Sequence, residues 1–230
     1  MSRAKSLLLV RLVLAAAIIL ELQGCNNQSN VRVEKPIALA TPAPVASATP
    51  VPKLPPPTKA EVEDAFHRVF GVDLTARFVE GQTFVVGDFN GDQSEDIGII
   101  VRPAPGKLGD INSDFANWII QDADKAFIPP PGDTVVVPPK QKPAKLASGE
   151  TVLAVIHGFG PKGWRTADAR QSYLIKHAAA PLMGTASSTD QKYIRDLKLN
   201  IETVIIKELR DNKKGYVFWT GSVYAWHTGG

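Results

Sequence analysis

The sequence predicts an α+β fold with a mainly antiparallel sheet, two to three packed helices, one hairpin around a polar loop and a C-terminal β-meander. Apolar residues recur at helical spacing after Thr58. Two apolar runs flank a polar loop within Phe84 to Ile100, and short apolar runs alternate with turns from Glu202 to Trp226. Because strands and helices alternate irregularly, we expect α+β and not a regular parallel α/β arrangement.

Composition divides the 230 residues into three parts. Residues 1–24 carry basic residues before a short apolar run, which predicts an export signal too short to span a bilayer stably. Residues 25–57 are rich in Pro, Ala and Thr, so we expect a semi-rigid, extended tether. A ligand for a proline-binding partner is the alternative. Residues 58–230 are long enough for one globular domain.

The chain contains a single cysteine, Cys25, so no disulfide can form within it. The segment Leu22-Gln23-Gly24-Cys25 resembles the bacterial lipobox, whose cysteine is lipidated and becomes the mature N-terminus. The resemblance implies lipidation of Cys25. Asn26 stands where the inner-membrane retention signal would be Asp, which implies an outer-membrane anchor, periplasmic or surface-facing. The alternative is a lone thiol in a tail.

The charge balance gives no reason to expect nucleic acid as a partner. The formal net charge is +3, but residues 1–24 hold three basic residues and one acidic residue. The exported part is therefore nearly neutral, and a neutral chain lacks the basic field that draws proteins to a phosphate backbone.

The loop inside Phe84 to Ile100 is the strongest chemical signal. Oxygen-bearing residues alternate along it, at positions 1, 3, 5, 7 and 9 if the carbonyl of the seventh residue is included: Asp88, Asn90, Asp92, Ser94 and Asp96. A hard cation such as Ca²⁺ uses this alternation. The pattern predicts a structural calcium site that pins two strands, and an Asp/Asn-rich turn without an ion is the alternative.

This loop resembles the Asp-x-Asn-x-Asp-Gly-x-x-Asp loops of FG-GAP and VCBS repeats, within a Gly-Asp-Phe-Asn-Gly-Asp context. The resemblance implies a calcium-bearing hairpin. Gln93 stands where those families place the glycine of a sharp turn. The families build β-propellers from several blades, whereas this chain has one such loop and no repeat, so we do not expect a propeller.

A second motif is Gly158-x-Gly160-x-x-Gly163, which has the spacing of a dinucleotide-binding fingerprint. We discount a nicotinamide site because the acidic residue expected some twenty positions later is missing. Lys162, Trp164 and Arg165 instead form a candidate anion- or partner-binding site at a helix start. The alternative is a glycine-rich connection with exposed basic residues and a tryptophan packed on the sheet.

Other elements follow from local patterns. Thr58 and Glu61 form a capping box for the first helix, and helices are expected near Phe115 to Asp122 and from about Thr166 to Ala180. Strands are expected at these positions: Thr151 to Ile156, Glu202 to Glu208, Tyr216 to Trp219, Ser222 to Trp226, and an edge strand at Val135 to Val137 inside a long loop. Aromatic residues alternate along the last hairpin, which predicts one core face.

These observations predict a lipid-anchored, exported, non-enzymatic binding module stabilised by calcium. Its binding face would combine Lys162, Trp164 and Arg165 with the terminal aromatic hairpin, and its partner would be a protein or the cell wall. One alternative is a small periplasmic hydrolase that acts on an anionic or cell-wall substrate through His157 and a carboxylate such as Asp88 or Asp96. Another is a structural or assembly lipoprotein that works through protein partners.

Overall fold

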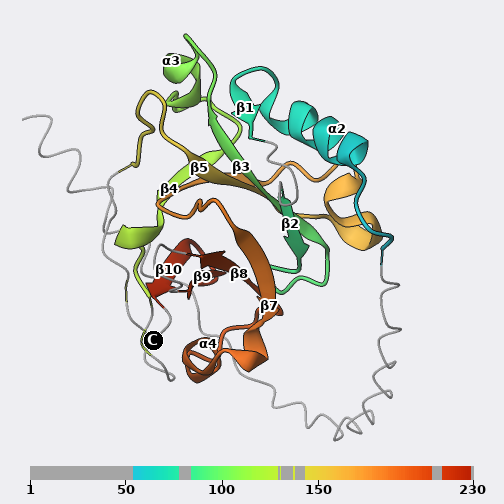
Figure 1. Ribbon diagram of the computed structural model, residues 1–230, viewed down its shortest axis with the longest axis vertical. Helices are drawn as coiled ribbons and strands as arrows, with labels where there is room; N and C mark the ends of the chain where they lie inside the picture. Colours follow the sequence, from blue (N-terminus) through green and yellow to red (C-terminus); the bar gives the residue numbers. More distant parts are fainter. Residues whose placement is uncertain are drawn as a thin grey trace, which may run out of the picture. The chain divides into compact units, whose positions relative to one another are not determined.

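The computed structural model describes residues 54–77, 84–128, 130, 137, 143–208 and 214–228. The signal segment, Cys25, most of the tether and most of the predicted edge strand at Val135 to Val137 lie outside these ranges. The described residues form two sheets with short and long helices around them, which confirms the α+β class and the mainly antiparallel pairing (Figure 1). None of the described helices has the length and apolar character needed to cross a membrane.

The first sheet has the strand order β1-β3-β5-β6-β4, with β2 also paired to β3. All its pairs are antiparallel except β4 with β6, which is parallel. Its strands are β1 (Leu74–Ala76), β2 (Phe84–Gly87), β3 (Asp96–Pro103), β4 (Ile119–Asp122), β5 (Val152–Ile156) and β6 (Ser172–Lys176).

The second sheet is antiparallel throughout and has the order β10-β9-β8-β7. Its strands are β7 (Met183–Ser187), β8 (Thr203–Glu208), β9 (Lys214–Trp219) and β10 (Tyr224–Thr228). Strands β8, β9 and β10 are consecutive along the chain and adjacent in space, so the predicted C-terminal meander is confirmed. This sheet faces the first sheet, as Figure 1 shows in orange to red below the green and yellow strands.

The first sheet is covered on both faces, and its strands are apolar for that reason. Leu153 and Val155 of β5 point into the core shared with the second sheet. Ala154 and Ile156, which alternate with them, point to the other face and pack with α2 (Lys59–Phe70). All five residues of β5 are buried. The two hydrophobic cores therefore lie on opposite faces of one sheet.

Helix α2 begins as its sequence predicts. The Thr58 hydroxyl accepts from the Glu61 amide at 3.3 Å, and the Glu61 carboxylate accepts from the Thr58 amide at 2.8 Å. The buried face holds Val62 and Phe66, and the helix ends at Gly71. The remaining helices are short: α3 (Leu108–Ile111), α4 (Lys192–Asp196) and the 3₁₀ turns η1 (Ala123–Lys125), η2 (Gly160–Arg165) and η3 (Ser188–Asp190).

Two predicted helices are wrong. The stretch expected to be helical up to Asp122 contains strand β4, and the stretch expected to run to Ala180 contains strand β6. Tyr173 and Ile175 pack in one core while Leu174 packs in the other. A short strand that is buried on both faces has no polar alternation, so its apolar run cannot be distinguished from a helix by spacing.

Candidate functional site

The predicted metal loop closes the hairpin between β2 and β3. Gly87 pairs with Asp96, so residues 88–95 form the turn. The Asp88 carboxylate accepts from the amide of Gly91 at 2.7 Å through Oδ1 and from the amide of Gln93 at 2.8 Å through Oδ2. Gln93 has φ +68°, so it makes the sharp left-handed turn although it is not glycine. The hairpin and its turn therefore fold as the sequence predicts.

Side chains within the loop also hold one another. The Asn90 amide nitrogen donates to Asp92 Oδ2 at 3.0 Å, and the Asp92 amide donates to Asn90 Oδ1 at 3.1 Å. Asp92 Oδ1 accepts from the amide of Ser94 at 2.8 Å. These contacts fix the side chains of Asn90 and Asp92 against the loop backbone and against each other.

Asp96 is the buried end of the loop, with no exposed surface. Its Oδ2 accepts from the amide of Phe89 at 2.8 Å and its Oδ1 accepts from the amide of Gly158 at 2.7 Å. Burial raises the pKa of Asp96 to about 8, although both amides oppose that shift, and the neighbouring carboxylates of Asp92 and Asp88 raise it further. A cation in the loop would stabilise the ionised form of the Asp96 carboxylate, which burial otherwise disfavours.

The backbone of the loop is hydrogen-bonded on two sides, to η2, which follows β5 of the first sheet, and to the start of β8 in the second sheet. On one side the amide of Trp164 donates to the Glu95 carbonyl at 2.8 Å. On the other side the amide of Thr203, at the start of β8, donates to the Asp88 carbonyl at 3.0 Å. The approach is close on that side too, because a Cβ on Gly91 would lie 1.9 Å from the Asn200 carbonyl oxygen. The loop thus joins the first sheet to the second.

The predicted binding face at Lys162, Trp164 and Arg165 needs correction. Lys162 is exposed, but Trp164 is completely buried, and its indole nitrogen donates to Glu95 Oε1 at 2.9 Å. A buried indole cannot contact a partner. The alternative interpretation of a tryptophan packed on the sheet fits its position.

Arg165 is engaged by the protein itself. Its Nη1 donates to Glu95 Oε1 at 2.6 Å, its Nε donates to Glu61 at 3.3 Å and its Nη2 donates to the Pro55 carbonyl at 2.7 Å. The guanidinium also lies 4.2 Å from the centre of the Trp164 ring. Arg165 therefore ties the loop to α2 and to the residues before it, and an anion would have to displace these contacts.

His157 does not reach the surface. It is 2% exposed and packs among Tyr173, Trp219 and Tyr224. Burial lowers its pKa to about 4, so the ring is neutral at ordinary pH. The Asn90 amide nitrogen lies 3.3 Å from Nδ1, which makes Nδ1 the acceptor and leaves the proton on Nε2 to donate to the Tyr224 hydroxyl at 2.7 Å. A hydrolase acting through His157 would need the core to open.

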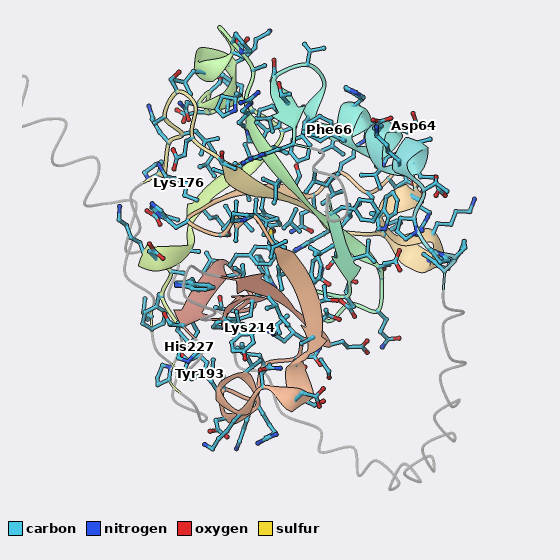
Figure 2. All side chains as sticks on the ribbon, in the orientation of Figure 1. Asp64, Phe66, Lys176, Tyr193, Lys214 and His227 are labelled. Atoms are coloured by element: carbon cyan, nitrogen blue, oxygen red, sulfur yellow. The ribbon has the colours of Figure 1, made fainter. Side chains whose placement is uncertain are left out.

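The terminal hairpin contributes to the core with both of its faces, whereas its aromatic alternation predicted a single core face. Tyr224 pairs directly with Trp219, so the two share one face of the sheet, and Phe218 lies on the opposite face; all three are buried or nearly so. Figure 2 shows His227 of β10 beside Tyr193 of α4, and the two rings stack at 3.5 Å with an angle of 5° between their planes. This stack attaches α4 to the outer end of the second sheet.

A second polar cluster was not predicted. Asp122, Asp124 and His177 place their ligand atoms within 4.8 Å of one another, and within the described ranges this is the one such group of three acidic, histidine or cysteine side chains. The carboxylates of Asp88, Asp92 and Asp96 do not all meet this distance. The cluster could hold a metal ion. Its sequence signal was Asp-x-Asp at the end of an apolar run, which the wrong helix assignment placed at the end of the helix expected near Phe115 to Asp122.

Hydrogen bonds fix Asp122 within this cluster. His177 Nδ1 lies 2.7 Å from Asp122 Oδ1, and Lys125 Nζ lies 3.2 Å from Asp122 Oδ2. Burial would raise the pKa of Asp122, but the contacts with His177 and Lys125 outweigh it and hold this pKa below its ordinary value.

Comparison of the chain with protein-family models, with curated proteins and with solved structures finds no match.

Proposed function

We propose that this chain is an exported protein, anchored at the outer membrane by acyl chains on Cys25, whose folded domain is a non-enzymatic binding module stabilised by calcium. The supporting observation is the position of the loop from Asp88 to Asp96, which carries oxygen ligands in the calcium alternation and contacts segments of both sheets. The partner we expect is a protein or the cell wall.

The chemistry of the loop favours calcium over softer metals. Its five candidate ligands are all oxygens: Asp88, Asn90, Asp92, the Ser94 carbonyl and Asp96. Calcium accepts six to eight oxygens at about 2.3–2.6 Å, so opposed ligands can lie about 5 Å apart. Calcium therefore tolerates a wider spacing of its ligands than a smaller cation does, and the three loop carboxylates, whose oxygens do not all lie within 4.8 Å of one another, would move toward a shared ion. Even a site with millimolar affinity would fill in a calcium-rich exterior.

A structural role for this ion follows from the contacts around it. The loop backbone bonds to Trp164 on one side and to Thr203 on the other, whereas the nearest base, His157, is buried and neutral. An ion that binds only the folded chain stabilises it by mass action, by about 2.7 kcal/mol when its concentration is 100 times its dissociation constant.

Thermal unfolding of the full chain in detergent, after exhaustive chelation and with or without added calcium, tests the metal site. We expect calcium to raise the midpoint, and we expect Asp92→Ala to abolish the rise. Asp114→Ala is the matched control, since Asp114 ends a Gly-Asp-Ile-Asn-Ser-Asp segment of similar composition outside the loop and is exposed. A midpoint that ignores calcium, together with no heat of calcium binding in calorimetry, would refute the site.

The anchor is tested separately by metabolic labelling with palmitate and by fractionation. Cys25→Ser should lose the label and move the protein from the membrane fraction to the soluble fraction, because acylation supplies the membrane affinity. Ser29→Ala, four residues later, should behave like the unmodified chain. A labelled and membrane-bound Cys25→Ser chain would exclude lipidation at this cysteine.

A further inference from the structure

The cluster of Asp122, Asp124 and His177 is built by two parallel strands. Asp122 ends β4 and pairs in register with Lys176, the last residue of β6. His177 follows directly, and Asp124 lies in the 3₁₀ turn after β4. The carboxyl ends of β4 and β6 therefore lie side by side, although the two segments are more than fifty positions apart in the sequence. The parallel pairing fixes the spacing between the residues that follow these strands.

The distances within the cluster match those between ligands of one small metal ion. His177 Nδ1 lies 2.7 Å from Asp122 Oδ1 and 3.5 Å from Asp124 Oδ2. Metal–ligand bonds of about 2.1 Å separate neighbouring ligands by roughly 3.0 Å in an octahedron and roughly 3.4 Å in a tetrahedron. The two separations bracket this range, so one ion can meet all three side chains with small adjustments.

The donor set indicates the class of ion. One imidazole nitrogen with two carboxylate oxygens suits zinc and similar divalent transition metals, whereas calcium prefers oxygen ligands alone. We propose that Asp122, Asp124 and His177 bind a zinc-class divalent cation through two carboxylate oxygens and His177 Nδ1. This site is independent of the calcium loop, which shares none of its residues.

Three protein ligands leave at least one coordination position for water or another ligand, as in zinc sites that exchange ligands and unlike closed structural sites. Asp122 is 9% exposed, while the side chains of His177 and Asp124 are about half exposed. The ion can therefore enter from solvent and rest on a buried carboxylate. Asp122 also lines a cavity of about 640 Å³ together with Lys125 and Lys176, so the site borders a space that a small ligand can occupy.

Two existing contacts of Asp122 adjoin the proposed position of the ion, and a third, with His177 Nδ1, is the one that the ion replaces. Lys125 holds Asp122 Oδ2, and the amide of Asp124 donates to Asp122 Oδ1 at 3.3 Å. Neither contact has to break if the ion binds through Oδ1, since a carboxylate oxygen has more than one lone pair. Binding does require His177 Nδ1 without its proton, so zinc takes the place of the proton between Nδ1 and Oδ1.

Calorimetric titration of zinc into the chelated full chain, with calcium present in excess, tests this proposal. We expect one zinc site, with the affinity falling at least about ten-fold in His177→Asn and in Asp124→Asn. Asparagine is the replacement at position 177 because His177 has φ +61°, which Asn tolerates better than Ala. His67→Asn, which changes an exposed histidine of α2, should leave the affinity unchanged.

A second readout distinguishes the two metal sites. Cobalt bound at the cluster should show visible absorption bands that disappear in His177→Asn and persist in Asp92→Ala. The Asp124→Asn variant keeps the proposal testable if the change at His177 impairs folding, because Asp124 is half exposed. Absence of a zinc site in the unmodified chain, or unchanged zinc affinity in both cluster variants, would overturn the proposal whatever the outcome for calcium.

Discussion

The backbone amide of Gly158 donates a hydrogen bond of 2.7 Å to the buried Oδ1 of Asp96. This contact joins the end of β5 to the last residue of the polar loop. Gly158 is the first glycine of the sequence that resembles a dinucleotide fingerprint, and its neighbour in space is the polar loop. A Cβ on Gly158 would lie 2.3 Å from the Glu95 carbonyl oxygen, and one on Gly163 would lie 2.5 Å from the same atom. The glycines allow two backbones to touch.

Gly158→Ala should destabilise the domain by more than about 2 kcal/mol, because the added methyl group meets a backbone carbonyl that cannot rotate away. Gly184→Ala is the matched control. Gly184 lies in β7 with φ outside the left-handed region and with no atom near its Cβ position, so its replacement should change stability by less than about 0.5 kcal/mol. Chemical denaturation of both variants measures the difference, and equal stabilities would contradict the close approach of Glu95 to Gly158.

Glu95 and Arg165 should be coupled far more strongly than an exposed ion pair. Their side chains are 23% and 13% exposed, and the 2.6 Å hydrogen bond between them is reinforced by the indole of Trp164 on the same carboxylate oxygen. A double-mutant cycle with Glu95→Gln and Arg165→Met should give a coupling free energy of about 1–2 kcal/mol. The same cycle with Asp196→Asn and Lys192→Met, an exposed pair within α4, should give about 0.5 kcal/mol or less. A coupling for the first pair no larger than that for the second would show that solvent screens it.

Local signals in the sequence were sufficient for several elements. The capping box at Thr58 and Glu61 fixes the start of α2, because its two hydrogen bonds form within one turn. The hairpin around Asp88 to Asp96 is equally local, since its carboxylates bond to amides a few residues away. The terminal meander follows from alternation and short turns.

The rest depends on contacts that are distant in sequence. Strand β4 pairs with β6, more than fifty residues later, and no local pattern announces a parallel partner. The error over β6 concealed the cluster of Asp122, Asp124 and His177, because His177 fell within a predicted helix instead of at a strand end beside Asp122. Burial of His157 was also hidden, since His157 adjoins a glycine-rich loop that suggests a surface, and for Trp164 the sequence left surface and core open as alternatives.

Tyr224→Phe should lower the free energy of unfolding by about 1–2 kcal/mol, although it removes a single oxygen atom and leaves the ring in place. The Tyr224 hydroxyl lies 2.7 Å from Nε2 of His157, and both side chains are buried, so the variant leaves a polar nitrogen without this partner. Tyr216→Phe, on the half-buried part of β9, should cost less than about 0.5 kcal/mol. Nitrogen NMR shifts of His157 should show the proton on Nε2 in the unmodified protein. A proton on Nδ1 would contradict the hydrogen-bond assignment to Asn90.

His227 of β10 should titrate below its ordinary pKa of 6.5, because partial burial penalises its charged form. The stacked ring of Tyr193 would favour the protonated form of His227 and so raise its pKa. The direction of the pKa shift therefore shows whether the loss of solvent outweighs the attraction to the ring. With the folded-state pKa lowered, the unfolded chain takes up the proton first. The contribution of His227 to the free energy of unfolding is then fully present above pH 6.5, and it is lost as the pH decreases through 6.5 toward the folded-state pKa.

Proton NMR titration of the His227 imidazole measures the midpoint directly. Tyr193→Leu should leave the midpoint below 6.5 if burial is the cause, since the leucine still covers the ring while the attraction for a cation is lost. His227→Gln should remove this part of the pH dependence from denaturation curves recorded between pH 5 and 7, an interval of about one unit on each side of the ordinary value. A His227 midpoint at or above 6.5 in the unmodified chain would show that the aromatic stack prevails over burial.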